Sequence, residues 1–216
     1  MKKFNYVLPL LTMFFVIQLS KAQNDSKSYT FKDFQKVAIE NINGDVEIEI
    51  GTAYSITVSS KDNFYNQVQI TRSGDKLTVK FDKKPTSDWK DNKVVHVKIV
   101  MPKLLGLLNF SNADVRVQKF EGSYFSIENI GNGNVSVSGS IVDQLELYNK
   151  GNGNLETKNI IAKKAKISKS GNGDVTLKTD SDFKVEMDGN GDIVNYGQGT
   201  AIIEKQRGTG KVVMRN

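Results

Sequence analysis

The sequence predicts an all-β fold: a right-handed parallel β-helix, or solenoid, with rungs of about 20 residues and a β-hairpin inserted in the N-terminal third. The main evidence is a tetrad, Gly-Asn-Gly-Asn/Asp, which recurs with starts 20, 20 and 18 residues apart. An aliphatic residue follows each copy, and apolar residues alternate on both sides of it. A fixed period of this length indicates one structural unit stacked on itself. The four tetrads occupy residues 131–134, 151–154, 171–174 and 189–192.

The N-terminus has the composition of a secretory signal peptide. Two lysines precede a largely apolar stretch, residues 8–19, and small residues end it at the positions that signal peptidase recognises. We expect cleavage between Ala22 and Gln23, so residues 1–22 are a signal peptide and residues 23–216 form one domain. The alternative is an uncleaved anchor, but the apolar stretch is shorter than the ~20 residues of a membrane-spanning helix.

The composition argues against several classes of protein. Of the formal net charge of +6, three positive charges lie in the predicted signal peptide, and the other lysines are spread among acids, which does not indicate a nucleic-acid interface. The chain has no cysteine, and therefore neither a disulfide nor the lipid-attachment site of a bacterial lipoprotein. We expect an exported protein, periplasmic or secreted to the cell surface, with no membrane span after signal removal. The densest basic run is expected to be a solvated strand face: Lys163, Lys164, Lys166 and Lys169.

Each rung is expected to contain two strands. Residues two and four positions after the second glycine of a tetrad, such as Val135 and Val137, alternate with polar residues, which is typical of a strand with one buried face. Residues eight and six positions before it, such as Phe125 and Ile127, form a second alternating strand. Parallel stacking would place equivalent residues about 4.8 Å apart. The connectors carry isoleucines that predict a partly buried third side: Ile141, Ile160 and Ile161.

The tetrads are predicted to be corners rather than ligand sites. Glycine reaches positive φ without steric cost, and asparagine tolerates the left-handed region, so the tetrad can turn the chain sharply. Stacked asparagines can also share amide hydrogen bonds along the wall. The predicted corner ladder comprises Gly131, Asn132, Gly133, Gly151, Asn152, Gly153, Gly171, Asn172, Gly173, Gly189, Asn190 and Gly191.

The N-terminal third keeps the alternation of apolar residues but loses the 20-residue period. Asn43-Gly44-Asp45-Val46 marks what looks like a first rung, far ahead of the equivalent residues 112–115. We interpret the interval as an insertion. Within it, residues 68–81 have the pattern of a β-hairpin, and residues 95–101 alternate like a strand that Pro102 ends.

Both ends of the stack need a cover, because an open sheet edge invites aggregation. At the N-terminal end, residues 82–93 and residues 29–34 are the candidate caps. At the C-terminal end, Glu204 would occupy an inward position beside Ile202 and Ile203. We therefore expect the last strand to slip by one residue or to bulge.

Candidate chemical sites are few, and no catalytic residue, cofactor or metal ligand is predicted. Asp174 and Asp192 resemble part of the calcium-binding repeat of β-rolls, but that motif recurs about every nine residues rather than once in 18–20. Glu146, Lys166 and Lys184 share one outward column. A polysaccharide-processing enzyme of the β-helix type would place its acids and bases on such a face, but a solvated sheet face gives the same alternation of charge.

Two aromatic residues in polar surroundings are the candidate ligand contacts. Trp89 and Tyr65 can stack on a sugar or anchor a protein partner. The alternative for Trp89 is that it folds back as a cap over the open end of the core.

A further set of motifs extends over nearly the whole chain. The strand Phe34-x-x-Val37-x-Ile39 is followed by Asn43-Gly44-Asp45-Val46, by the strand 95–101 with its terminal Pro102, and then by the Gly-Asn-Gly-Asp rungs. This combination resembles the bacterial family described as putative auto-transporter adhesin, head GIN domain, over about residues 30–214. The resemblance implies an exported β-helical domain suspected in surface adhesion, with no established catalytic residues.

We therefore predict a non-catalytic exported binding or adhesion module. Its repetitive β-sheet surface would face a partner such as a cell-surface glycan or an envelope protein. The alternatives are a polysaccharide-processing enzyme and a purely structural envelope protein, and the sequence leaves the oligomeric state open.

Overall fold

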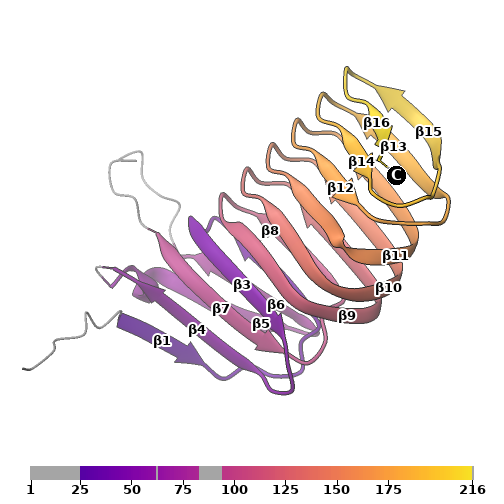
Figure 1. Cartoon of the computed structure of the whole chain (residues 1–216). Coiled ribbons are helices and arrows are strands. Elements are labelled where there is room, and N and C mark those ends of the chain that lie inside the picture. Colours follow the sequence, from indigo (N-terminus) through magenta and orange to yellow (C-terminus); the bar gives the residue numbers. More distant parts are fainter. Residues whose placement is uncertain (1–24, 62, 83–93, 216) are drawn as a thin grey trace, which may run out of the picture.

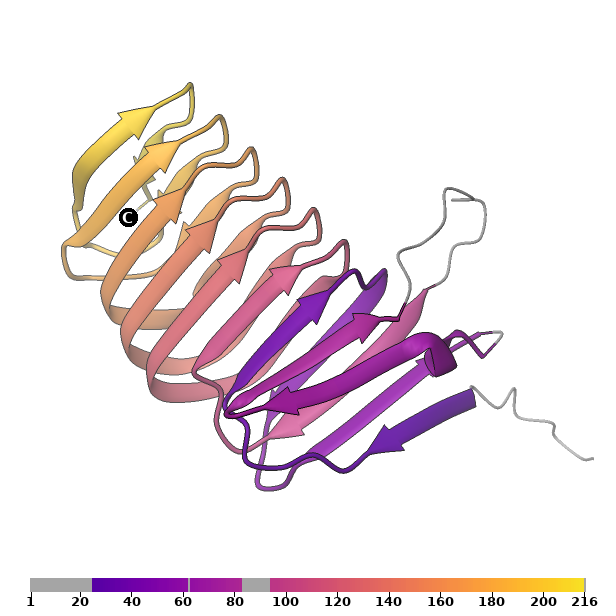
Figure 2. The same ribbon diagram turned by 180° about the vertical axis from the view of Figure 1, so that it is seen from behind.

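The computed structural model describes residues 25–61, 63–82 and 94–215 of the 216-residue chain. This part of the chain is all-β, with sixteen strands in one large, mostly parallel sheet and one short 3-10 helix (Figures 1 and 2). The predicted signal peptide and its cleavage site lie outside the described residues.

The N-terminal third contains seven strands and the 3-10 helix. They are β1 (Asp25–Tyr29), β2 (Lys36–Glu40), β3 (Gly44–Ile50), β4 (Ser55–Ser60), η1 (Phe64–Gln67), β5 (Val68–Ser73), β6 (Lys76–Phe81) and β7 (Val95–Met101). The remaining strands are β8 (Gly106–Phe110), β9 (Asp114–Asn129), β10 (Val135–Asn149), β11 (Leu155–Lys169), β12 (Val175–Leu177), β13 (Phe183–Asp188), β14 (Ile193–Asn195), β15 (Ala201–Arg207) and β16 (Val212–Met214).

Strands β9, β10 and β11 carry the 20-residue period. Val135 pairs in parallel with Val115 on one side and with Leu155 on the other, and the second halves of these strands keep the same offset. Each predicted pair of strands is one continuous strand that bends, with register shifts on both sides of Gly139. The connector is extended enough to pair with its neighbours, so the expected break between the two strands is absent here (Figure 2).

The two halves of the long strands form two faces of one folded sheet. We call them the first wall (β7, β3, the first halves of β9 to β11, β12, β14 and β16) and the second wall (β6, β2, β8, the second halves of β9 to β11, β13 and β15). Alternate residues of both walls are buried in a single core, as their apolar alternation predicts. The inward columns include Val115, Val135, Leu155, Val175 and Ile193 from the first wall and Phe125, Leu145, Ala165 and Phe183 from the second.

The bend between the walls is only partly covered. Phe120 and Phe125 fill it from inside, with ring centroids 4.4 Å apart. Ile160 is fully buried, but the side chains of Ile141 and Ile161 are 49% and 37% exposed. The predicted third side is therefore buried at one of its three isoleucines.

The N-terminal third confirms the predicted hairpin and corrects the order of the strands. β5 and β6 pair antiparallel over residues 68–81. β3 pairs in parallel with β9, with Val46 opposite Val115, although β4 to β8 lie between them in the sequence. The intervening β6 and β7 lie on the other side of β2 and β3. The unit marked by Asn43-Gly44-Asp45-Val46 is thus enclosed between two others and is not the first in the stack.

Antiparallel strands cover the N-terminal end of the stack. β4 pairs with β7, and β1 pairs with β4, so they follow β7 at that end of the sheet (Figure 1). Phe34 is fully buried, and Tyr54 packs on it and donates a hydrogen bond from its hydroxyl to the Phe34 carbonyl. Of the candidate caps, residues 29–34 contribute to this cover, and residues 83–93 lie outside the described part.

β15, the last strand of the second wall, contains the predicted irregularity. The register of β13 with β15 shifts between Val185 and Glu186, because Glu204 is an extra residue on β15. The shift leaves Ile202 and Ile203 about half exposed and lets Glu204 form an ion pair with Lys184.

Candidate functional site

The tetrads form a ladder of asparagines on the outer surface of the corners. Each side-chain amide donates a hydrogen bond to the amide oxygen one unit earlier, at 2.9–3.1 Å, and the set runs from Asn190 through Asn172, Asn152 and Asn132 to Asn112. Thr209 extends it by donating to Asn190. The amides face one another along the stack and leave few free groups for a ligand.

The glycines of the tetrads serve a different purpose from the one predicted. Among the tetrad glycines only Gly189 has a positive φ, at 155°. A Cβ atom on Gly151 would instead overlap the carbonyl oxygen of Gly131 in the unit below. The same collision would occur at Gly171 with the Gly151 carbonyl and at Gly153 with the Gly133 carbonyl. Glycine is required here because the backbones stack in direct contact.

A second row of polar side chains bonds the backbone. The side-chain oxygen of Asp114, Asn134, Asn154, Asp174 and Asp192 in each case accepts the backbone N–H of the equivalent residue in the next unit, at 2.8–2.9 Å. Asp174 and Asp192, the two aspartates that resemble a calcium motif, belong to this row. In the described residues, no group of three or more His, Asp or Glu side chains is positioned to hold a metal ion.

A third row lies inside the core and was not predicted. Asn109, Asn129 and Asn149 are fully buried and point inward after the last apolar residue of the second wall. The amide of Asn149 donates to the carbonyls of Gly153 and Gly173, and so joins the corners of two units. The sequence does contain a signal for this row, because Asn129 and Asn149 each lie two residues before a tetrad and are 20 residues apart. It was missed because an inward position usually indicates an apolar residue.

Lys169 continues this buried row and is the exception to the predicted solvated basic face, because Lys163, Lys164 and Lys166 are exposed as expected. It pairs with Asn149 in register, its side chain is 1% exposed, and its ammonium donates to the Gly171 carbonyl at 2.6 Å. Burial lowers its pKa below the ordinary value, although the nearby Asp174 and Asp192 oppose that change.

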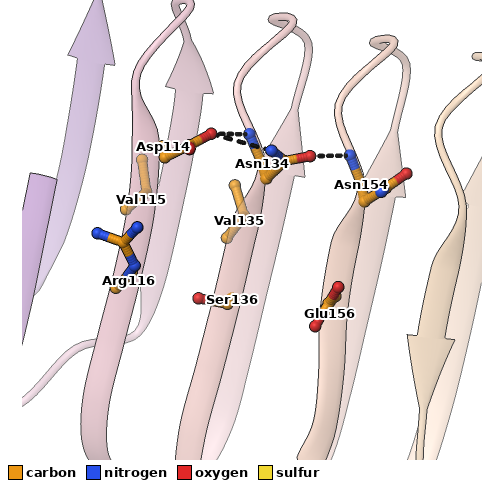
Figure 3. Close-up of a pocket in the computed structure, with 8 residues that line it drawn as sticks. All are labelled: Asp114, Val115, Arg116, Asn134, Val135, Ser136, Asn154 and Glu156. Atoms are coloured by element: carbon orange, nitrogen blue, oxygen red, sulfur yellow. Dashed lines mark hydrogen bonds between the residues drawn. The ribbon is translucent and has the colours of Figure 1, made fainter. Parts of the chain in front are cut away.

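A shallow groove of about 290 Å³ lies on the outer face of the first wall (Figure 3). Ser136 pairs with Arg116 on one side and Glu156 on the other, so a short side chain lies between two long ones and leaves a hollow. The groove is lined by Asp114, Val115, Arg116, Asn134, Val135, Ser136, Asn154 and Glu156. It offers hydrogen-bond donors, acceptors and both signs of charge.

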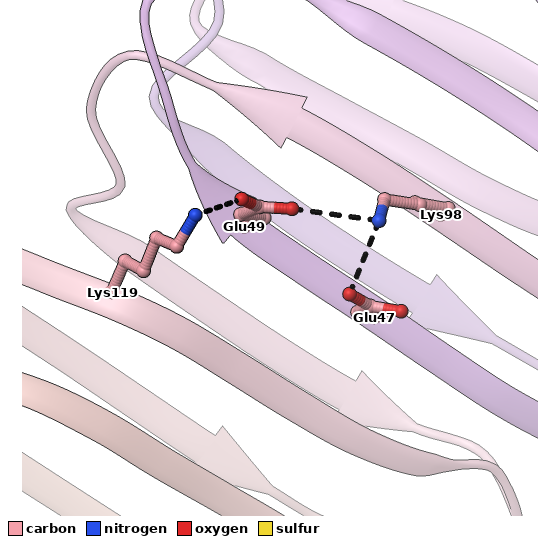
Figure 4. A network of polar contacts seen from close by, with 4 residues as sticks. All are labelled: Glu47, Glu49, Lys98 and Lys119. Atoms are coloured by element: carbon pink, nitrogen blue, oxygen red, sulfur yellow. Dashed lines mark hydrogen bonds and ion pairs between the residues drawn. The ribbon is translucent and has the colours of Figure 1, made fainter.

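A charged network lies on the same face, next to the groove (Figure 4). Lys98 of β7 lies 3.3 Å from Glu47 and 3.4 Å from Glu49, two carboxylates of β3, and Lys119 of β9 lies 2.6 Å from Glu49. Arg116 lies between the groove and the network, since it is the register partner of Glu47 and its guanidinium is 3.3 Å from Asp45 on β3. The outer face of the first wall is therefore a continuous surface of paired charges.

The network does not have the electrostatics of an acid–base catalyst. The hydrogen bond and charge of Lys119, with a contribution from Lys98, lower the pKa of Glu49. Glu47 raises the pKa of Lys98. At neutral pH Glu49 is a carboxylate and Lys98 an ammonium, so neither group is poised near neutrality as a general acid or base requires.

The predicted outward column on the second wall is present in the structure. Glu146 pairs with Lys166, which pairs with Lys184. The residues of the column interact with different partners. Glu146 accepts hydrogen bonds from Tyr124 and Tyr148, while Lys184 forms an ion pair with Glu204. The column does not bring two carboxylates together.

Of the two predicted aromatic contacts, only Tyr65 lies in the described part of the chain. Tyr65 lies in η1, half-buried against the core, and its backbone N–H donates to the hydroxyl of Ser60. Trp89 lies outside the described residues.

The fold is similar to those of solved bacterial proteins. The chain is similar to a putative adhesin from Bacteroides fragilis NCTC 9343, with 20% identity, a TM-score of 0.70 and coverage of 88% of this chain and 96% of that chain. It is also similar to a putative lipid binding protein from Parabacteroides distasonis ATCC 8503, with 14% identity, a TM-score of 0.52 and coverage of 89% and 96%. At these identities the likeness concerns the fold.

The sequence was also compared with curated proteins and with family models. No curated protein matches the sequence. In the described part of the chain, no helix has the length and apolar character needed to cross a membrane. A family model matches residues 33–199, most of the chain, and includes every tetrad and the hairpin. The chain therefore belongs to the family described as putative auto-transporter adhesin, head GIN domain.

Proposed function

We propose that this protein is a non-catalytic, exported binding or adhesion module whose first wall binds a cell-surface glycan or an envelope protein. In this proposal the sheet winds as a right-handed parallel β-helix, which the constant 20-residue offset of parallel strands supports. Family membership supports the adhesion role. Cleavage after Ala22 and release to the periplasm or the cell surface belong to the same proposal.

The groove is the observation that carries the proposal. It is hollowed by one serine between an arginine and a glutamate, and it continues into the charged network of β3, β7 and β9. A ligand lying across the strands would meet a polar group in each successive unit, about 4.8 Å apart. Such a surface suits an extended polar partner better than a small apolar molecule, which requires an enclosed pocket.

The experiment fills the groove without touching the core. Ser136→Trp replaces a half-buried outward serine, and we expect it to abolish binding of the mature protein to at least one ligand among the glycans of a polysaccharide array and immobilised envelope vesicles. Ser59→Trp is the matched control, since Ser59 is also a half-buried serine but lies on β4, outside the groove lining. Equal binding by the two variants would show that the groove is not the site.

The enzyme alternative has a separate test. Incubation with the same polysaccharides should yield no shortened products if the module only binds. Turnover that disappears in Glu146→Gln, Lys166→Met or Lys184→Met would overturn the non-catalytic assignment.

A further inference from the structure

A cluster on the second wall, which the groove does not include, has the composition of a sugar site. The hydroxyls of Tyr124 on β9 and Tyr148 on β10 both donate to the same oxygen, Oε2 of Glu146, at 3.0 and 3.2 Å. All three side chains are half-buried and point outward. We call Tyr124, Glu146 and Tyr148 the tyrosine patch.

Short neighbours leave the tyrosine patch accessible from solvent. In register, Ser126 lies beside Glu146, and Ser168 lies beside Tyr148. Neither serine is long enough to cover an aromatic ring or a carboxylate. The second oxygen of Glu146, Oε1, has no hydrogen-bond partner among the described residues.

The charges around the tyrosine patch leave Glu146 as a hydrogen-bond acceptor. Glu128, which is opposite Tyr148, is neutralised by Lys150 at 3.0 Å. Glu146 forms no ion pair within the described part of the chain, although Lys166 is its neighbour in register. Its carboxylate therefore keeps a negative charge with acceptor capacity to spare.

We propose that the tyrosine patch binds a ring of a neutral glycan. A tyrosine ring offers an apolar face with a polar edge, which matches the C–H face and the hydroxyl rim of a hexose. The free Oε1 of Glu146 accepts hydrogen bonds from sugar hydroxyls, and the two phenols hold that carboxylate in place. A uronic acid would bring a second negative charge to the same oxygen and is rejected.

The phenols remain protonated throughout the physiological range. Burial, with the charge and hydrogen bond of Glu146, raises the pKa of Tyr124 and the pKa of Tyr148 above the ordinary value of 10.0. They are donors to Glu146 and are not poised as nucleophiles.

Matched oligosaccharides test the proposal by titration calorimetry. The probes are β-1,4-linked hexamers of glucose, mannose and galactose, each compared with the same hexamer oxidised to the uronic acid at C6. We expect at least one neutral hexamer to bind, and its oxidised form to bind at least tenfold more weakly. Failure of all three neutral hexamers to bind, or equal binding of an acidic form, would overturn the proposal.

Substitutions then locate the site. Tyr148→Ala and Glu146→Gln should each weaken the neutral hexamer at least tenfold, and Tyr124→Phe, which keeps the ring, should weaken it less. The matched controls are Tyr196→Ala, between β14 and β15, and Glu47→Gln on β3 of the first wall, which should bind normally. Ser136→Trp should also bind normally, which separates this site from the groove. Unchanged binding in Tyr148→Ala, with its fold verified by circular dichroism, would contradict the assignment.

Discussion

Lys169 lies directly opposite Asn149 in the paired strands β10 and β11, and its ammonium takes the buried place that an asparagine amide takes in the preceding units. The amide of Asn149 reaches two corner carbonyls, whereas the ammonium of Lys169 reaches one. A buried ammonium with incomplete hydrogen bonding costs more than a satisfied amide. Lys169 is therefore an energetic weak point in the row.

The first prediction replaces Lys169 with asparagine, the residue that the preceding units have at this buried position. Lys169→Asn should raise the free energy of unfolding by about 1–2 kcal/mol, because a neutral amide avoids the desolvation of a charge. Urea unfolding at pH 7 measures the difference. A loss of stability would mean that the attraction of Asp174 and Asp192 for the ammonium outweighs its burial.

The second prediction concerns pH. The pKa of Lys169 is lowered in the folded protein, so between that pKa and the ordinary value of 10.5 the unfolded chain binds more protons. Stability contributed by this residue therefore rises with pH in that interval and is constant below it. The difference in unfolding free energy between the wild type and Lys169→Met, measured from pH 7 to pH 10.5, should change in favour of the wild type. A flat difference would show that the folded pKa is not lowered.

The third prediction compares two asparagines three residues apart. Asn149→Ala removes the side-chain donor to the buried Gly173 carbonyl and one of the two side-chain donors to the Gly153 carbonyl, the other being Asn129, and should cost about 2–3 kcal/mol. Asn152→Ala removes exposed ladder bonds that water can replace, so it should cost about 1 kcal/mol or less. Thermal and urea unfolding give the ranking, and equal costs would refute the distinction between the inner and outer rows.

The fourth prediction separates steric contact from backbone conformation. Gly151→Ala would force a methyl group into the Gly131 carbonyl, and we expect a loss of about 3 kcal/mol or failure to fold. Gly122→Ala is the control, because its Cβ would meet only ordinary contacts and should change stability by less than about 1 kcal/mol. A well-folded Gly151→Ala protein of normal stability would contradict the direct stacking of the corners.

The fifth prediction tests the charged network. The pKa of Glu49, measured by carboxyl NMR titration, should lie below 4.5 and should return toward 4.5 in Lys119→Met. Because the folded pKa is lowered, the contribution of Glu49 to stability is present above the ordinary pKa and is lost as the pH falls through the folded one. Lys98→Met should have a smaller effect, and no change in either variant would exclude the network in solution.

The repeats made much of the architecture predictable. The period of the tetrads identified the pairing of Val135 with Leu155, the alternation identified the buried columns, and the parity break at Glu204 identified the bulge. These features follow from local spacing, which a sequence shows directly.

Other features depended on contacts between distant segments. β2 pairs with β6 on one side and β8 on the other, and β3 pairs with β7 and β9 in the same way. These pairings join segments that are distant in the sequence, and no spacing of motifs reveals them. The burial of Lys169 and the position of Asn129 contradicted the usual link between polarity and exposure, because inward polar residues bond the corner carbonyls. The tyrosine patch could not be predicted, since Tyr124 and Glu146 meet only through the register of two strands.

The central claim is that residues about 20 positions apart lie over one another along the stack, and one distance tests it most directly. The natural chain has no cysteine, so nitroxide labels on Asn112→Cys and Asn190→Cys report one distance by pulsed electron paramagnetic resonance. Four steps of ~4.8 Å separate these corners, which predicts a narrow distribution centred at about 19 Å, broadened by the label arms. A centre beyond about 30 Å, or a distribution without a peak, would contradict the stacked structure and both binding surfaces built on it.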